Sequence, residues 1–244
     1  MILKSFFKAG KQIPFVLLLL AGITQNAAAQ GLEPVEQPWY VGAGLGTSFG
    51  QCTFRSITQS DMHWGFQGVL TGGYRMNRLI SFEAGLQFGS QTQTSPDGYP
   101  YWLSADGERY VSPVINRKGW YYRDIECSKG WTKILVQANV DGLGLFMAPD
   151  CRWSFNVSPQ LSVITTKSTF VTPVDEVDND RQWHLGLGAQ ISLGYQVNDD
   201  LGVALFSGVT CLTGKRFDNI PDGSQKGNSI WDTGIKVTYR LAIK

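Results

Sequence analysis

Two short groups of residues carry the side chains that a hydrolase would need. Ser60, Asp61 and His63 lie close together, and Asp180 comes shortly before His184. An acyl hydrolase uses a nucleophile, a histidine and an acid within hydrogen-bond reach. Neither group contains a nucleophile motif such as G-x-S-x-G, and no other ligands at suitable spacing accompany the histidines to hold a metal. We therefore interpret both histidines as polar residues near strand ends, and we expect no catalytic residue, metal or cofactor.

The chain has four cysteines, Cys52, Cys127, Cys151 and Cys211, and export makes disulfides between them possible. Cys52 and Cys127 fall in two long irregular segments that we place at the same end of the fold. They are therefore the preferred disulfide pair in an exported protein. Cys151 falls in a short turn at the opposite end, and Cys211 lies near the first end, so these two are too distant to bridge. The alternative is that all four cysteines are free thiols and no disulfide forms.

An acidic run lies in residues 172–182 and includes Asp175, Glu176, Asp178 and Asp180. Ca²⁺ prefers several oxygen ligands, but the run lacks the glycine and the glutamate spacing of a known calcium loop. We interpret it as a solvated charged loop. The net charge of the whole chain is +1, which implies no nucleic-acid partner.

The N-terminal segment has the composition of a secretory signal peptide. A cationic start is followed by an apolar run and then by small residues: Lys4, Lys8 and Lys11, then Ile13–Ile23, then Ala27–Ala29. The apolar run is short for a transmembrane helix, which needs about 20 residues. We expect cleavage near Ala29, and no cysteine follows that site to carry a lipid anchor. The predicted organisation is a signal peptide, a periplasmic lead-in and one β-domain: residues 1–29, 30–38 and 39–244.

Hydrophobic alternation predicts that the rest of the chain is built from β-strands. Every second residue from Trp183 to Val197 is apolar, and the residues between them are polar or glycine. A period of two indicates a strand with one apolar and one polar face. The turn Asn198-Asp199-Asp200 then leads into a second strand at Leu201. The same alternation recurs and predicts eight strands: 39–49, 62–76, 79–91, 131–146, 152–170, 183–197, 201–214 and 230–243.

The predicted connections alternate between long and short. Long segments follow the first, third, fifth and seventh strands: 50–61, 92–130, 172–182 and 215–229. Successive connections of an up-and-down barrel lie at opposite ends, so all the long loops share one rim. Outer-membrane barrels have this asymmetry, with short periplasmic turns and long external loops. Within the longest loop, Tyr101–Ser112 predicts a small hairpin that turns at Ala105-Asp106-Gly107.

Bulky aromatic residues of the apolar face gather at the strand ends. One group lies near the short-turn rim: Trp39, Tyr74, Trp153, Tyr195 and Tyr239. The other lies near the long-loop rim: Phe49, Trp64, Trp131, Trp183 and Trp231. Two aromatic belts about a membrane's thickness apart are typical of lipid interfaces. A soluble β-sandwich would not explain their concentration at both ends.

The polar face of the strands is rich in small residues and carries charges of both signs: Arg75, Glu83, Lys133, Asp141, Arg152, Asp232, Lys236 and Arg240. An eight-stranded barrel has an interior that side chains fill, and buried charges there must be paired. We interpret these residues as a lumen charge network, with Arg75 and Glu83 as the best single pair. A proton or ion path is the alternative. The predicted fold is all-β: an eight-stranded antiparallel up-and-down transmembrane β-barrel.

The signal peptide ending in AAAQ, the first strand WYVGAGLGTSFG and the eight alternating strands together resemble a known family. This is the small outer-membrane β-barrel domain family, which is common in the Bacteroidetes and includes PorT-like proteins. The resemblance covers the chain from about Trp39 and implies the same fold and location. The chain departs from many barrels at its end, Tyr239-Arg240-Leu241-Ala242-Ile243-Lys244, because an aromatic residue is often last.

The leading functional hypothesis is a non-enzymatic outer-membrane barrel with a filled lumen. Its long external loops would contact a ligand or other envelope proteins, and its wall would contact outer-membrane lipid. Three alternatives remain open: a narrow pore or transport-associated barrel, a lipid-modifying envelope enzyme, and a secreted lipocalin-like carrier.

Overall fold

The computed structural model describes residues 37–96, 100–148, 151–178, 180–213 and 228–242. The predicted signal peptide, the lead-in up to residue 36 and most of the last long loop lie outside the described residues. Eight long strands form the body of the protein: β1 (Trp39–Gln51), β2 (Phe66–Arg75), β3 (Ile80–Thr94), β7 (Glu126–Asp141), β8 (Trp153–Val171), β10 (Gln182–Gln196), β11 (Leu201–Leu212) and β12 (Asn228–Arg240).

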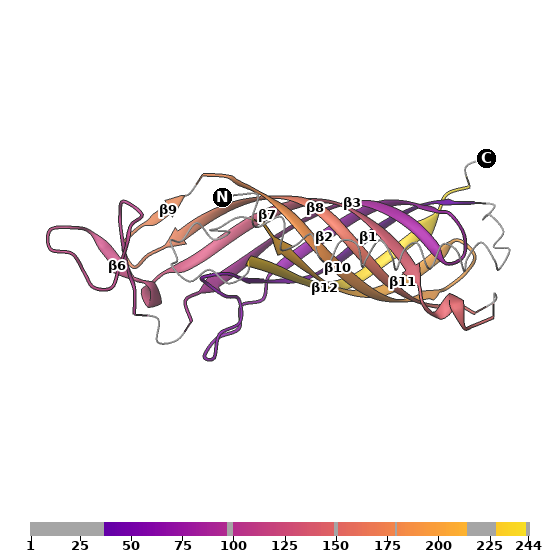
Figure 1. Ribbon diagram of the computed structural model, residues 1–244, viewed down its shortest axis with the longest axis horizontal. Coiled ribbons are helices and arrows are strands. Elements are labelled where there is room, and N and C mark those ends of the chain that lie inside the picture. Colours follow the sequence, from indigo (N-terminus) through magenta and orange to yellow (C-terminus); the bar gives the residue numbers. More distant parts are fainter. Residues whose placement is uncertain (1–36, 97–99, 149–150, 179, 214–227, 243–244) are drawn as a thin grey trace, which may run out of the picture.

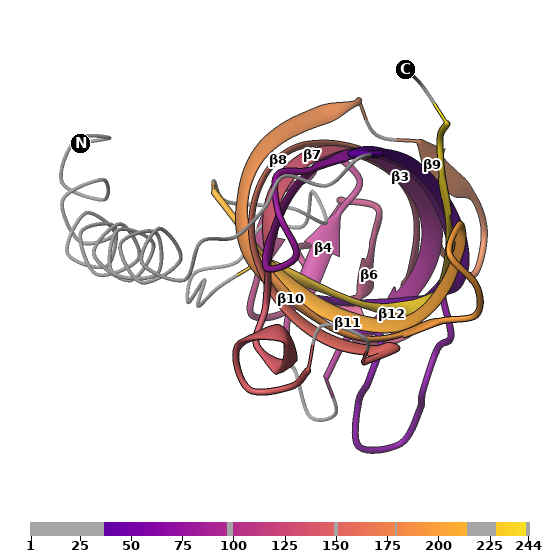
Figure 2. The same cartoon turned by 90° about the vertical axis from the view of Figure 1, so that its right-hand side faces the viewer.

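These strands form a closed antiparallel barrel. Each pairs with its sequence neighbours among the long strands, in the order β10-β11-β12-β1-β2-β3-β7-β8, and β8 also pairs with β10. The first and last strands close the ring, because Tyr40–Gln51 of β1 pairs with Ser229–Arg240 of β12. The ring is complete when viewed along its axis (Figure 2). The predicted eight-stranded up-and-down barrel is therefore confirmed.

The apolar face of the wall points outward. In β10, Leu185 and Ile191 are exposed, whereas His184, Gln190 and Ser192 on the other face are buried. The same arrangement holds around the ring, where Leu, Val and Ile side chains cover the outside. A soluble barrel would place apolar residues inside, so this wall is built to face lipid. Among the described residues, none of the helices has the length and hydropathy to span a membrane.

The two ends of the barrel differ as the loop lengths predict. Short connections join β2 to β3 and β10 to β11 at one end. At the other end β7 and β8 extend beyond the ring and carry β9 (Glu176–Asp178), as the left side of Figure 1 shows. The predicted hairpin is present as β4 (Trp102–Ser104) and β5 (Arg109–Tyr110), and β6 (Gly119–Tyr121) adds a third strand.

The bounds of β7 show the largest error of the strand prediction, and β2 also begins later than predicted, at Phe66 instead of residue 62. The alternation suggested residues 131–146, but β7 runs from Glu126 to Asp141 and the short helix η2 (Leu143–Leu145) follows it. Asp141 ends the strand because its Oδ1 accepts the backbone N–H groups of Leu143 and Phe155, each at 3.0 Å. Its carboxylate thus satisfies the donors that the turn leaves unpaired.

Candidate functional site

The lumen is crossed by a buried ion pair. Lys133 on β7 and Asp232 on β12 place Nζ and Oδ2 3.1 Å apart, and both side chains are 0% exposed. Three strands lie between β7 and β12 in either direction around the ring, so the two residues come from opposite walls. Lys133 Nζ also donates to Thr210 Oγ1 at 3.0 Å. The pair therefore fixes a lysine side chain across the middle of the barrel.

A second ion pair lies nearer the short-turn rim. Lys236 Nζ donates to Oε1 and Oε2 of Glu83 at 2.8 and 2.9 Å. The same carboxylate accepts Gln137 Nε2 at 3.1 Å and the Tyr40 hydroxyl at 3.2 Å. A charge that is removed from water requires this number of partners, so the Glu83 carboxylate is held by a polar network from several strands.

The predicted Arg75–Glu83 pair is wrong. Across the β2–β3 ladder, Arg75 faces Ser81, and Glu83 faces Gly73. A Cβ added to Gly73 would lie 2.1 Å from the Tyr40 ring, so this glycine makes the space in which Tyr40 reaches Glu83. Glu83 is thus directed deeper into the lumen, toward Lys236 on β12, and away from the rim where Arg75 lies.

Little space remains between these charged layers. The cavity lined by Val69, Glu83, Gln87, Leu135 and Lys236, among others, has a volume of about 10 Å³. A single water needs about that much space. Glutamines fill the surrounding levels of the lumen: Gln67, Gln87, Gln91, Gln93, Gln137, Gln160 and Gln190 are all buried. The interior is therefore packed with side chains along its central part.

Toward the long-loop end an apolar plug replaces the charged layers. Trp131 is 3% exposed and packs with Ile164, Leu212 and Ile230 inside the barrel. Its predicted place in the outer aromatic belt is therefore wrong. Trp131 shares the inward face of β7 with Lys133, since residues two apart in a strand point to the same side. The alternation of residues along this strand therefore already indicates that Trp131 points inward.

The other predicted belt residues lie on the outer face. At the short-turn rim, Trp39 contacts Tyr74 with ring centroids 5.0 Å apart, and Trp153 contacts Tyr195 at 4.9 Å. At the opposite rim Phe49 is only 7% exposed because Trp64 and Trp231 cover it. The remaining members are exposed, as a lipid interface requires: Trp39, Tyr74, Trp153, Tyr195, Tyr239, Trp64, Trp183 and Trp231.

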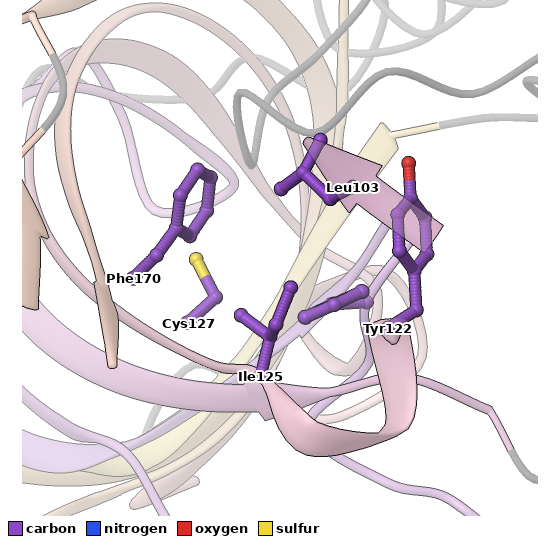
Figure 3. Close-up of a cluster of buried hydrophobic side chains, with 6 residues drawn as sticks. Leu103, Tyr122, Ile125, Cys127 and Phe170 are labelled. Atoms are coloured by element: carbon purple, nitrogen blue, oxygen red, sulfur yellow. The ribbon is translucent and has the colours of Figure 1, made fainter. Parts of the chain in front are cut away.

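The long loops form a folded head with its own core. Phe54 from the first long loop, Leu103 from β4 and Tyr122 from the short helix η1 (Tyr122–Asp124) pack against Cys127 and Phe170. The last two belong to the extended ends of β7 and β8 (Figure 3). Because Cys127 and Phe170 continue the inward faces of these strands, the cluster lies at the long-loop end of the lumen.

All four cysteines are thiols in this structure, so the predicted Cys52–Cys127 disulfide is not formed. Cys127 belongs to the core of the folded head, whereas Cys52 packs against the Trp131 cluster. The Cys52 thiol also donates to the carbonyl oxygen of Phe54 at 3.1 Å. The two side chains thus lie in different clusters. Cys211 is exposed on the outer wall, and Cys151 follows the short helix η2.

Opposite charges are also paired on the surface of the head. Lys118 contacts Asp175 and Lys167 contacts Asp178, both at 2.7 Å. The hydrogen bond from Lys167 and a second from Thr169 hold the pKa of Asp178 below its usual range. The acidic run is therefore a set of solvated surface contacts. The described residues include no group of three or more His, Cys, Asp or Glu that could hold a metal ion.

The two histidines contact threonines. His63 Nε2 lies 3.4 Å from Thr94 Oγ1, and His184 Nδ1 lies 3.2 Å from the carbonyl oxygen of Thr213. His184 is buried on the inward face of β10, as its parity predicts. Both histidines lie toward the long-loop end.

Sequence reasoning missed Lys129, which it left inside the loop 92–130. Lys129 is 0% exposed, and its Nζ donates to Gln93 Oε1 at 2.8 Å inside the barrel. The alternation of Cys127, Lys129, Trp131 and Lys133 on one face could have revealed it. The remaining predicted lumen charges, Arg75, Asp141, Arg152 and Arg240, line a cavity of about 500 Å³ at the short-turn rim.

No protein-family model matches this chain, and no curated protein matches it. Among solved structures, Neisserial surface protein A is 12% identical with a TM-score of 0.49, over 83% of this chain and 97% of that one. The attachment invasion locus protein Ail of Yersinia pestis is 8% identical with a TM-score of 0.44, over 84% and 100%. The outer membrane protein OprG of Pseudomonas aeruginosa is 10% identical with a TM-score of 0.37, over 86% and 100%.

Proposed function

We propose that this chain is a non-enzymatic integral protein of a bacterial outer membrane whose lumen is closed by its own side chains. The Lys133–Asp232 pair carries the proposal, because it joins opposite walls with both side chains fully buried. The Glu83–Lys236 layer and the Trp131 cluster fill the levels on either side of it. Such a barrel has no open path for ions or solutes, and its wall contacts outer-membrane lipid.

The external head is the part that we propose to act on other molecules. Four cations stack on aromatic rings there: Arg109 on Tyr101, Arg117 on Tyr110, Lys118 on Trp120 and Arg123 on Tyr121. Cation–π contacts and a buried core stabilise a defined surface, and a defined surface costs less ordering on binding than a flexible loop. We assign this surface to contact with a ligand or another envelope protein. We also propose, from the resemblance of the AAAQ segment, the first strand and the eight alternating strands, that the chain belongs to the small outer-membrane β-barrel domain family of the Bacteroidetes.

The orientation can be tested with a short epitope inserted at either end. One insertion follows Asp106, in the turn where Gly107 has a φ of 85°. The matched control follows Asp199, in the short turn between β10 and β11. On intact cells, we expect an antibody to bind the first epitope and to reach the second only after the outer membrane is permeabilised. The reverse pattern, or recovery of the protein in the soluble fraction, would overturn the proposal.

A further inference from the structure

The short-turn rim opens into a polar vestibule that the plugged lumen does not require. This is the cavity of about 500 Å³, and its lining includes Arg75 at the end of β2, Arg152 before β8 and Arg240 at the end of β12. β2 and β12 flank β1, whereas two strands separate β8 from each of them. Arg152 therefore faces the other two arginines across the mouth of the barrel.

These three guanidinium groups differ from the other cations of the lumen. Lys133 and Lys236 each contact a carboxylate. In the part of the chain that the structure describes, no side-chain hydrogen bond or ion pair joins Arg75, Arg152 or Arg240 to the protein. Arg75 and Arg240 lie at the same rim on the two strands that flank β1, and their like charges repel each other. Like charges held in a partly enclosed site raise its energy, and a bound anion would relieve that repulsion.

Among the described residues, the acidic side chains that line the vestibule form no ion pair with the three arginines. Glu83 at the floor is held by Lys236, and Asp141 Oδ1 accepts two backbone N–H groups while its charge attracts Arg75. Asp199 and Asp200 lie in the exposed turn at the edge. A fourth arginine, Arg78, already has a hydrogen-bond partner in the protein, because it donates to the carbonyl oxygen of Gly144 at 2.7 Å.

We propose that the vestibule binds a phosphate group that enters from the short-turn side. A guanidinium donates two parallel hydrogen bonds to an oxyanion. A planar carboxylate suits one such fork, whereas a tetrahedral phosphate has further oxygens for guanidinium groups on the opposite side of the mouth. The volume lies in the range of small-molecule sites, about 300–1,000 Å³. The Glu83–Lys236 layer closes the floor, so the ligand enters and leaves by the same rim.

The experiment uses the full barrel purified in a non-ionic detergent without phosphate. Inorganic phosphate is titrated in and binding is followed by calorimetry. We expect saturable binding that the double variant Arg75→Gln/Arg240→Gln weakens by about tenfold or more, the equivalent of roughly 1.4 kcal/mol. The matched control, Arg55→Gln/Arg181→Gln, removes the same charge from two exposed arginines at the long-loop end and leaves binding unchanged. Arg152→Gln, at an exposed position, provides a second test if the double variant does not fold.

Two sources can supply the phosphate, and a second arm separates them. Phosphatidic acid is added to phosphatidylcholine nanodiscs that contain the barrel. Displacement of inorganic phosphate by this lipid assigns the site to a phospholipid headgroup of the periplasmic leaflet, whereas its failure assigns the site to a soluble phosphate. Equal phosphate affinity in the wild type and both arginine variants would overturn the proposal. Because binding is measured in detergent, this result is independent of the orientation test.

Discussion

Removing one partner of the pair that crosses the lumen, by Lys133→Met, should destabilise the barrel strongly. Asp232 would keep a buried carboxylate without its cation, and its Oδ1 already lacks a hydrogen-bond partner. Breaking a fully buried pair in this way costs about 3–5 kcal/mol of unfolding free energy. Replacing both partners, as Lys133→Met/Asp232→Leu, should return stability to within about 1 kcal/mol of the wild type, because no uncompensated charge remains.

The measurement is equilibrium unfolding in urea, with the barrel in phospholipid vesicles and its 8 tryptophans as the fluorescent probe. The same double-mutant cycle on Lys167 and Asp178 is the matched control. That pair is shorter, 2.7 Å against 3.1 Å, but its side chains are 53% and 60% exposed. We expect a small coupling free energy between Lys167 and Asp178, because water and salt screen the attraction between exposed charges. Equal coupling in the two cycles would refute the assignment of Lys133 and Asp232 to a dry lumen.

Three further predictions concern the wall, the head and the thiols. On the wall, Val136→Arg should cost about 2–4 kcal/mol in vesicles, as for a lipid-facing site near mid-membrane. Val177→Arg on β9, at the long-loop end, should be nearly neutral. Equal effects of the two substitutions would contradict a lipid-facing β7. In the head, NMR titration should give Asp178 a pKa below its usual value. Its contact with Lys167 is therefore fully present above about pH 4 and is lost as the pH falls through the lowered pKa. The variant Lys167→Met should raise the pKa of Asp178, and an unchanged pKa would exclude Lys167 as the cause. Without reductant, a detergent-soluble maleimide should label Cys211 in the folded barrel and all 4 thiols after unfolding. Labelling of only two thiols in the unfolded protein would indicate a disulfide.

The fold was predictable because one physical constraint repeats along the chain. Each strand must present an apolar face to lipid and a polar face to the lumen, and a period of two records this in the sequence. The lengths of the connections then distinguish the rim that carries the long loops from the rim that carries the short turns. The same period shows that Trp131 shares a face with Lys133, so its predicted place in the belt was an avoidable error. The end of β7 at Asp141 was harder to predict, because it depends on hydrogen bonds to Leu143 and Phe155.

The pairing of charges inside the barrel could not be predicted from the sequence. Parity shows that Glu83, Lys133, Asp232 and Lys236 point inward, and this part of the prediction agrees with their burial. Their partners depend on how far each strand is shifted along its neighbours and on which strands face each other across the ring. Gly73 illustrates the difficulty, since its missing side chain lets Tyr40 reach Glu83. The folded head depends likewise on contacts between separate loops.

The filled lumen is tested most directly by single-channel recording in planar lipid bilayers. The barrel, inserted and shown to be folded by its heat-modifiable gel mobility, should give no current steps across the full range of applied voltage. This prediction rests on the Lys133–Asp232 and Glu83–Lys236 layers and the Trp131 cluster, which fill successive levels of the lumen. Steady, reproducible single-channel openings from the wild-type protein would contradict this account.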